Sequence, residues 1–498
     1  MTGALHPLIQ AERQPDKTAY LFASDDSPVT VSYALLASRI LKGAQLLRKL
    51  GLKTGDGIVV VSENHPDLLC LYWAAQICGL YWTAISAQFQ HHEIAYILND
   101  CDARLLVTTT TQREKISEPP QPLELSLDDW LKTISAEPET LIADPAEGAE
   151  MLYSSGTTGR PKGVRASKPG APLGTVSELF ARRLELHQVD ASSVYLSTAP
   201  LYHSAPLRYN AMIHRSGGTS IIMPRFAAEP SLALIEAHRI THSQWVPTMF
   251  VRLLRLSEQV KQQYDLSSHR FAIHAAAPCP VGIKEQMMDW WGPILYEYYS
   301  GTEGNGQTAI SPEQWLQHKG SVGLSILGEL KIVDNQGDLV AEGVTGMVYF
   351  ADGPRFEYYK DPEKTASAFN THGWSTLGDI GHVDTEGYLY LTDRASQMII
   401  TGGVNVYPRE VEDVLLMHPA IQDAAVFGIP NTEFGESVRA AVELSPDSSA
   451  TEAELIDYCR SHLAHLKCPR QIDFHTNLPR HQTGKLYKQA LREPFWPD

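Results

Sequence analysis

Apolar runs and helical spacings alternate along most of the chain. Short runs rich in β-branched residues, which are typical of buried strands, lie at Gly57–Val61, 105–109 and 220–223. Between them, apolar residues recur three and four positions apart, and this spacing predicts helices at 32–50, 231–238 and 249–256. Strand–helix alternation of this kind favours α/β layers with a largely parallel sheet.

The pattern changes between about residues 320 and 392, where short strands alternate with Gly and Asp turns. We expect a compact antiparallel subdomain there. After Arg394 the pattern predicts a helix led by Pro408 (409–418), strands at 423–427 and 438–444, and a helix from Glu452. The chain is therefore predicted to divide into an N-terminal domain, residues 1–394, and a C-terminal domain, residues 395–498.

One uncharged stretch, residues 68–87, has the length of a membrane span. Polar and small residues interrupt it, so it predicts a buried helix ending at Cys78, a C-cap at Gly79 and a buried strand Tyr81–Ile85. The N-terminus lacks the basic start and apolar run of an export signal. The polar segment 112–138 is expected to be a long surface excursion.

Composition narrows the class of protein. The chain has 498 residues, which exceeds the size at which one core stops growing, so two or more domains are expected. Its formal net charge is −17, which argues against a nucleic-acid or anionic-membrane partner. Six cysteines without a CxxC pair predict free thiols in a reducing compartment, and we expect a cytoplasmic monomer or homodimer.

The clearest chemical signal is MLYSSGTTGRPKG at residues 151–163. A short apolar strand runs into a loop of Ser, Thr and Gly that ends at Lys162. Small residues let backbone N–H groups close on phosphate oxygens, the hydroxyls add donors, and the lysine supplies charge. The loop is not a Walker A motif, because Pro161 occupies the place of its second glycine. Taken alone, such a loop is equally an ordinary surface turn.

Further short motifs follow in order: YSGTE at 299–303, TLGD at 376–379, DR at 393–394, GGVN at 402–405 and PRHQTGK at 479–485. Each has a plain structural reading by itself. Together they resemble the ANL superfamily of AMP-forming adenylating enzymes over essentially the whole chain, with bacterial acyl-CoA ligases nearest. The resemblance implies an α/β fold with a large multilayer N-terminal domain, a small β-barrel-like subdomain and a small mobile α+β C-terminal domain.

The resemblance also implies a reaction in two halves. A carboxylate attacks the α-phosphorus of ATP, giving an acyl-adenylate and pyrophosphate, and a nucleophile then takes the acyl group and releases AMP. CoA is the default acceptor, with Mg²⁺ and ATP as cofactors. The alternative is the amine of an amino acid, as in enzymes resembling coronafacic acid ligase, and loading of a carrier protein is a third acceptor. A non-catalytic nucleotide-binding protein on the same fold is the alternative from another class.

Family roles in ATP binding carry over by motif. The resemblance implies that the β- and γ-phosphates of ATP are held by Ser154, Ser155, Gly156, Thr157, Thr158, Gly159 and Lys162. Tyr299 stacks on adenine, and the base edge is bordered by Ala276, Ala277 and Pro278. Thr302 touches the α-phosphate, and Glu303 holds Mg²⁺, a hard cation suited to carboxylate and phosphate oxygens.

Three charged residues complete the implied catalytic set. Asp379 accepts the ribose hydroxyls with Arg394 assisting. Lys485 reaches the carboxylate and α-phosphate oxygens in the first half-reaction only, a task that suits a mobile point charge on a long stem.

For the second half-reaction, the family rotates its C-terminal domain about a hinge. The hinge position here is Ser396, where relatives usually carry Asp or Lys. Rotation would bring Gly402, Gly403 and Glu436 to the tunnel of the incoming nucleophile.

The acid pocket is less clear from sequence. His203 of the PLYH motif matches a position at the pocket mouth. Candidate walls are Met212, Trp245, Val246, Thr248, Met249, Ala275, Ala276 and Gly301. Since Ala275 stands where glycine is frequent, the pocket would be shortened by a methyl group, and a bulky apolar acid is favoured over acetate.

Two other constellations are given structural interpretations. His462, His465 and Cys468 fall three residues apart but look like a helix exit without a fourth metal ligand. Cys279 near His274 suggests a thiol nucleophile, but burial of the thiol is the expected reading.

Overall fold

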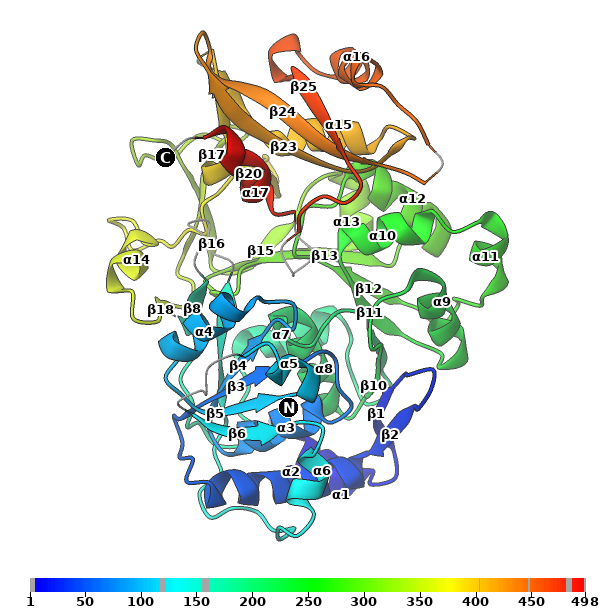
Figure 1. The fold of residues 1–498 in the computed structure, drawn as a ribbon, viewed down its shortest axis with the longest axis vertical. Helices are drawn as coiled ribbons and strands as arrows, with labels where there is room; N and C mark the ends of the chain where they lie inside the picture. Colours follow the sequence, from blue (N-terminus) through cyan, green and yellow to red (C-terminus); the bar gives the residue numbers. More distant parts are fainter. Residues whose placement is uncertain are drawn as a thin grey trace. The chain divides into compact units, whose positions relative to one another are not determined.

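The computed structural model describes residues 5–116, 122–154, 161–165, 167–402, 404–446, 448–480 and 486–496 (Figure 1). The chain forms two compact units. Unit 1 comprises residues 1–275, 290–307 and 354–367, and unit 2 comprises residues 276–289, 308–353 and 368–498. The predicted mixed α/β fold is confirmed, whereas the predicted boundary at residue 394 stays a prediction.

Unit 1 contains a seven-stranded sheet whose inner strands are parallel. The strand order is β18 (Glu357–Tyr358), β8 (Lys162–Arg165), β7 (Ala149–Ser154), β4 (Tyr81–Ile85), β3 (Gly57–Val61), β5 (Ala103–Thr108) and β6 (Leu123–Ser126). Only the β18–β8 and β8–β7 pairs are antiparallel. Helical connections return the chain to the same edge of the sheet, as parallel pairing requires.

A second sheet of unit 1 is also mainly parallel. Its strands follow the order β13 (Leu295–Ser300), β12 (Phe271–His274), β11 (His242–Trp245), β9 (Val194–Ser197), β10 (Thr219–Ile222), β1 (Thr18–Phe22) and β2 (Val29–Ser32). Among these seven strands, only β2 runs antiparallel to its neighbour, β1. The carboxyl ends of β11, β12 and β13 therefore open at one edge of this sheet.

The helices of unit 1 follow the predicted alternation. They are α1 (Pro7–Arg13), α2 (Tyr33–Lys49), α3 (Leu68–Ile77), α4 (His91–Asp100), α5 (Thr110–Arg113), α6 (Trp130–Ile134), α7 (Glu178–Leu186), α8 (Ser204–Ser216), α9 (Ala228–Ala237), α10 (Pro247–Leu254), α11 (Glu258–Gln263) and α14 (Pro362–Ser367). The strands and helices predicted from spacing are confirmed to within a few residues. For example, Ser32 Oγ caps α2 by accepting from Leu35 N at 3.2 Å.

The uncharged stretch forms the predicted helix, glycine turn and strand. Every residue of α3 is buried, which explains why its apolar residues follow no single face. Gly79 has φ +63°, and a Cβ there would lie 2.8 Å from Thr54 Cγ2, so glycine suits both the backbone and the space. In the described part of the chain, no helix is long and apolar enough to cross a bilayer.

The described residues of 112–138 lie mostly at the surface, as expected, but they form a strand and a helix rather than a loop. β6 adds a parallel strand to β5, and α6 follows it. Trp130 is fully buried in the main core and Gln112 is almost fully buried. A few buried side chains therefore hold a mostly polar segment against the sheet. They are too few to produce a hydrophobic periodicity that the sequence would display.

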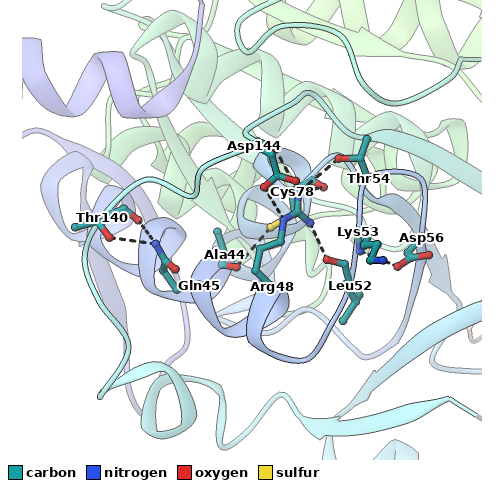
Figure 2. A network of polar contacts seen from close by, with 10 residues as sticks. All are labelled: Ala44, Gln45, Arg48, Leu52, Lys53, Thr54, Asp56, Cys78, Thr140 and Asp144. Carbon is teal, nitrogen blue, oxygen red and sulfur yellow. Dashed lines mark hydrogen bonds and ion pairs between the residues drawn. The ribbon is translucent and has the colours of Figure 1, made fainter.

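Arg48 joins the ends of α2 and α3 to the following chain (Figure 2). Its Nε lies 3.0 Å from Asp144 Oδ1, and its two terminal nitrogens donate to Leu52 O and Cys78 O at 3.0 Å each. These carbonyls lie just beyond the C-termini of two helices, where a cation is favoured by the helix dipole. The guanidinium thus fixes the layer of helices beneath the seven-stranded sheet.

Unit 2 has an antiparallel sheet in the predicted region. Its order is β16 (Glu329–Val333), β17 (Gly346–Ala351), β19 (Asp379–Val383) and β20 (Leu389–Arg394). The other elements before residue 394 are α12 (Val281–Trp291), β14 (Gln307–Ile310), α13 (Pro312–Gln317) and β15 (Leu324–Leu327). Gly337 and Gly387 adopt positive φ in turns of this region, as the pattern of Gly and Asp turns predicts.

The last hundred residues contain the predicted strands and helices. A five-stranded sheet has the order β22 (Val404–Val406), β21 (Ile399–Thr401), β24 (Gly435–Leu444) and β23 (Ile421–Asn431), with β25 (Gln471–His475) parallel to β24. The helical elements are η1 (Ala395–Gln397), α15 (Pro408–Leu416), α16 (Glu452–His462), η2 (His465–Lys467), α17 (Lys488–Arg492) and η3 (Glu493–Phe495). The apolar faces of α15 and α16 share one core cluster with the sheet, which includes Val411, Leu455 and Val442. Leu491 of α17 belongs to a second cluster, against which Phe495 of η3 packs.

Candidate functional site

The β7–β8 hairpin carries the predicted phosphate loop. Its register pairs Ser154 with Lys162. The side chain of Ser154 and the whole of Ser155, Gly156, Thr157, Thr158 and Gly159 lie outside the described residues. Lys162 is the first residue of β8, so it stands where the loop rejoins the sheet.

Lys162 lies among charged groups of unit 1. Its Nζ is 5.5 Å from the ring centre of Tyr358. Desolvation lowers the pKa of Lys162, the ammonium of Lys364 lowers it further, and the carboxylates of Asp361 and Glu303 oppose both effects. The arrangement places two ammonium groups beside two carboxylates, a charge pattern that suits a polyanion bound together with a cation.

The YSGTE motif lies at the end of β13. Tyr299 is next to last in the strand, and the chain then turns with Gly304 N donating to Gly301 O at 3.2 Å. Thr302 and Glu303 consequently lie beyond the carboxyl end of a parallel strand, where α/β proteins commonly bind ligands.

Tyr358 links two of the predicted site residues. Its hydroxyl donates to Glu303 Oε1 at 3.0 Å, and its ring is the one beneath Lys162. The pairing of β18 with β8, which sets Tyr358 opposite Val164, brings it there. The sequence gives no signal for Tyr358, because β18 has only two residues and lies outside every recognised motif.

His203 is the N-cap residue of α8. Its side chain is half-buried, and its ring makes an edge contact with Tyr202 at 4.5 Å between centroids. The helix it begins carries Met212, which is buried with Tyr195 and Tyr209 between α8 and the sheet. A position at a helix start leaves the imidazole at the edge of the core, which is compatible with the predicted pocket mouth.

The other candidate wall residues differ in environment. Trp245 is 1% exposed and packs edge-on against Trp291 at 5.2 Å, with Nε1 donating to Ser243 Oγ. Met249 and Ala275 are buried, whereas Val246, Thr248 and Gly301 are half-buried. Trp245 therefore belongs to an aromatic core cluster, and the half-buried residues keep surface for a ligand.

In unit 2, Asp379 and Arg394 face one another across β19 and β20. They are register partners, and Arg394 Nε lies 3.2 Å from Asp379 Oδ1. The Asp379 side chain is 11% exposed and the Arg394 side chain 41%. Gly378, with φ +82°, precedes the aspartate and allows the tight turn into β19. One carboxylate oxygen is thus positioned by the arginine.

The predicted base-edge segment begins unit 2. Ala276 is exposed and has φ +74°, a conformation that is uncommon for a residue with a Cβ. Ala277 is half-buried and Pro278 is exposed. Backbone strain of this kind concentrates at functional segments, which agrees with the predicted role without testing it.

The predicted acceptor and hinge residues lie within the last hundred residues. Ser396 belongs to η1, and its side chain lies outside the described residues, as do Gly403 and Lys485. Gly402 has φ +57° between β21 and β22, and a Cβ there would lie 3.2 Å from the Phe434 ring. Glu436 Oε2 accepts from Ile400 N at 3.3 Å, so this carboxylate tethers the glycine turn to β24.

The two constellations with structural interpretations have local partners. Cys468 is buried, with its sulfur 3.6 Å from Ala464 O, while His462 Nδ1 is 2.8 Å from Tyr458 O. Cys279 is buried. No cluster of three His, Cys, Asp or Glu with metal-binding geometry occurs among the described residues.

The chain is similar in sequence to known protein families. The family of AMP-binding enzymes matches residues 9–356, and the AMP-binding enzyme C-terminal domain matches residues 410–485. A long-chain-fatty-acid–CoA ligase, FadD13 of Mycobacterium tuberculosis, is 28% identical over 98% of this chain and 97% of its own.

Two solved structures are similar over nearly the whole chain. ATP-bound MatB from Rhodopseudomonas palustris has a TM-score of 0.84 and 26% identity, covering 98% of this chain and 99% of its own. The amide bond synthetase McbA from Marinactinospora thermotolerans has a TM-score of 0.81 and 25% identity, covering 99% and 100%.

Proposed function

Because the chain belongs to the AMP-binding enzyme family and is an AMP-forming acid ligase, we propose that it activates a bulky, largely apolar carboxylic acid with ATP. The acid becomes an acyl-adenylate with release of pyrophosphate, and the acyl group then passes to CoA. The observation that carries the proposal is the shared contact of Tyr358 with Lys162 and Glu303. It provides a cation for phosphate oxygens beside a carboxylate for a metal.

In the first half-reaction, residues of unit 1 would hold the triphosphate. Lys162 and the preceding loop would bind the β- and γ-phosphates, and Thr302 the α-phosphate. Glu303 fits Mg²⁺, because one carboxylate supplemented by phosphate and water oxygens is the usual protein contribution to such a site. When bound, the cation would neutralise phosphate charge. Both reacting groups are anions, so orientation and charge stabilisation dominate the barrier.

The residues of unit 2 would hold the nucleoside and supply the last charge. Asp379 would accept the two ribose hydroxyls while Arg394 fixes the carboxylate, and Tyr299 of unit 1 would stack on the base that runs along 276–278. Lys485 would approach the acid and the α-phosphate only while the adenylate forms. We propose that rotation about Ser396 then replaces it with the face that carries Gly402, Gly403 and Glu436.

The acceptor is proposed as CoA because FadD13, which is similar over 98% of this chain, is a CoA ligase. The similarity to the amide bond synthetase McbA favours an amine as the second candidate. All six cysteines are free and buried, which agrees with a reducing compartment, so we place the reaction in the cytoplasm.

One incubation tests the activation and the acceptor together. The enzyme, Mg-ATP, CoA and an amino-acid mixture are combined with a panel of carboxylic acids, and mass spectrometry follows acyl-CoA and N-acyl amino acids. Thioester formation supports the proposal, and amide formation moves the acceptor to an amine. ATP binding without acid-dependent pyrophosphate release from any acid would instead indicate a non-catalytic nucleotide-binding protein.

A further inference from the structure

A polar group of residues, none of them assigned to ATP, lies within unit 1 on α7, α8 and the strands that follow them in space. We call it the polar recess and define it by Arg183, Arg208, Tyr298 and Gln307. Arg183 lies on α7, Arg208 on α8, Tyr298 on β13 and Gln307 at the start of β14. Apolar residues of α7, α8 and β13 pack together in one cluster, which brings these three elements side by side.

Three of these four side chains keep open surface, whereas the side chain of Gln307 is fully buried. The Arg208 side chain is 32% exposed. Desolvation lowers its pKa, but the charge and hydrogen bond of Glu150 outweigh this effect, so the pKa of Arg208 is raised. Arg183 is half-buried, and desolvation lowers its pKa. Tyr298 is half-buried, and burial raises its pKa. Arg183, Arg208 and Tyr298 therefore keep side-chain surface that a ligand could contact.

The charge of the recess is only partly balanced. Glu150 Oε2 lies 2.6 Å from Arg208 Nε and so compensates that arginine. Arg183 donates to Gln307 Oε1 and lies 5.5 Å from the Tyr298 ring centre. No carboxylate in the described ranges lies within ion-pair distance of Arg183. The carboxylate of Glu150 acts on Arg183 from a distance, but the hydrogen-bond partner of the guanidinium is a neutral amide. An anionic ligand would add a direct counter-charge.

Gln307 provides an independent indication of a ligand. Its side chain is fully buried, and its Nε2 has no hydrogen-bond partner in the described structure. Since its Oε1 is occupied by Arg183, the amide orientation is fixed and the N–H groups are left over as donors. The recess therefore offers an amide donor beside a guanidinium, a combination suited to a planar, acceptor-rich anion.

The position of the recess connects it with the acid site. Arg208 follows His203, the predicted pocket mouth, by five residues on α8, and Tyr298 immediately precedes Tyr299 on β13. Gln244 of β11 donates to the Tyr298 hydroxyl at 3.3 Å, which joins a second strand end to the recess. The recess thus lies at the carboxyl ends of the parallel strands that carry the proposed site.

We propose that the polar recess binds a second carboxylate, at the far end of the organic acid, with Arg183 and Gln307 as the specificity-determining residues. The substrate is then a bulky acid with an apolar body and an anionic distal end. This inference rests on the proposed adenylation but extends it, because it assigns the distal charge of the acid to named residues.

Pyrophosphate–ATP exchange tests the inference, because it requires the acid and no acceptor. Matched acids are compared: phenylalkanoic acids with and without a para-carboxylate, and straight-chain monocarboxylic acids with dicarboxylic acids of equal length and their monomethyl esters. We expect the dianions to have the higher kcat/KM. In Arg183→Gln their KM should rise about 10- to 100-fold with little change in kcat, while monocarboxylates are unaffected. Arg182→Gln, one residue earlier on the exposed side of α7, is the matched control.

Melting temperature without ATP gives a readout that does not depend on catalysis. We expect dicarboxylates to raise the melting temperature of the native protein and of Arg182→Gln but not of Arg183→Gln. The ligand-free Arg183→Gln protein should melt close to the native protein, since removal of a desolvated charge offsets the lost hydrogen bond to Gln307 Oε1.

Several outcomes would overturn the inference. Monocarboxylates that exchange as well as dicarboxylates, or equal losses for both in Arg183→Gln, would show that the recess does not select a distal charge. A KM effect confined to an amino-acid acceptor would assign the recess to the second substrate. If dicarboxylates bind through Arg183 by melting temperature but no acid supports exchange, the recess stands and the adenylation proposal fails.

Discussion

The hydroxyl of Tyr358 donates a hydrogen bond to Glu303 Oε1 at 3.0 Å, and the ring of the same tyrosine lies 5.5 Å from Lys162 Nζ. One side chain therefore holds the carboxylate proposed for the metal and the ammonium proposed for the phosphates. A phenol that donates to a carboxylate fixes one oxygen and leaves the other available. Tyr358 is thus a positioning residue for both charges.

Replacing Tyr358 by Phe should separate these two contacts. The ring under Lys162 remains, but the hydrogen bond to Glu303 is lost, so we expect kcat/KM for Mg-ATP to fall about 10-fold. Raising the magnesium concentration should recover part of the loss. Tyr359→Phe is the control, because its hydroxyl contacts Asp102 instead. Unchanged magnesium dependence in Tyr358→Phe would contradict the positioning role.

Lys485→Ala should affect only one half-reaction. We expect adenylate formation, followed by pyrophosphate exchange, to fall about a thousandfold because a charge that stabilises the transition state is lost. Acyl transfer from preformed acyl-AMP should stay near its native rate, since the lysine is proposed to leave before that step. Lys467→Ala, whose ammonium pairs with Glu410, should change neither half-reaction. Equal losses in both would refute the assigned role.

Asp379→Asn should weaken ATP binding. The substitution keeps the shape but removes the charge that accepts two ribose hydroxyls and the ion pair with Arg394 at 3.2 Å. We expect the ATP dissociation constant, measured by calorimetry, to rise about 10- to 100-fold. Glu386→Gln, which alters an exposed carboxylate beyond the same β-strand, should leave it unchanged. An unaltered ATP affinity in Asp379→Asn would argue against ribose recognition.

The secondary structure and the order of the motifs could be predicted from the sequence because they depend on local patterns. The helix at α3, its glycine turn and the strand β4 follow from an uncharged run with Gly79 at its break. The motifs proposed for the ATP site can likewise be recognised by their order along the chain. Their chemistry is carried by residue types at short spacing, which a sequence displays directly.

Tertiary neighbours could not be predicted in the same way. Tyr358 reaches Glu303 from 55 positions away and Arg183 reaches Gln307 from 124 positions away. Neither pair shares an element or a motif, so no periodicity reports them. Trp245 shows a related limit: an aromatic residue near a motif suggests a pocket wall, but only the structure shows that its ring packs in a core cluster with Trp291.

Unit 1 should lose stability in mild acid because of its buried histidines. Burial lowers the pKa of four of them to about 3, namely His6, His187, His214 and His269. Burial lowers the pKa of the fifth, His242, to about 4. Below about pH 6.5 the unfolded chain binds protons that the folded one does not. Stability is therefore full above that pH and falls as the pH decreases, by up to about 1.4 kcal/mol per histidine and pH unit.

Urea unfolding at about pH 7.5 and about pH 5.5 measures this dependence. We expect a lower midpoint at the acidic pH and a smaller pH dependence in His214→Gln, because one proton-binding group is removed from the unfolded state. His462→Gln, which replaces an exposed histidine, is the control. A pH-independent midpoint over this range would show that the buried imidazoles are protonated in the folded protein.

Arg215→Met should destabilise unit 1 strongly. Arg215 Nη2 lies 2.6 Å from Glu147 Oε2, the two side chains are 10% and 7% exposed, and the guanidinium also donates to Leu5 O. Removing the arginine leaves a buried carboxylate without its counter-charge, which costs about 3–5 kcal/mol. Arg239→Met breaks a pair with Asp265 whose side chains are 62% and 51% exposed, so it should cost less than about 1 kcal/mol.

The double variant Arg215→Met with Glu147→Gln distinguishes the unpaired charge from lost packing. If the charge causes the loss, neutralising Glu147 should restore a large part of the unfolding free energy, because the amide oxygen of the new side chain can still accept the hydrogen bond from Gly174 N. Urea denaturation of the native protein, the two single variants Arg215→Met and Glu147→Gln, and the double variant gives the coupling energy between the two residues. A double variant as unstable as Arg215→Met would instead assign the loss to the contact of the guanidinium with the Trp73 ring, 5.0 Å away.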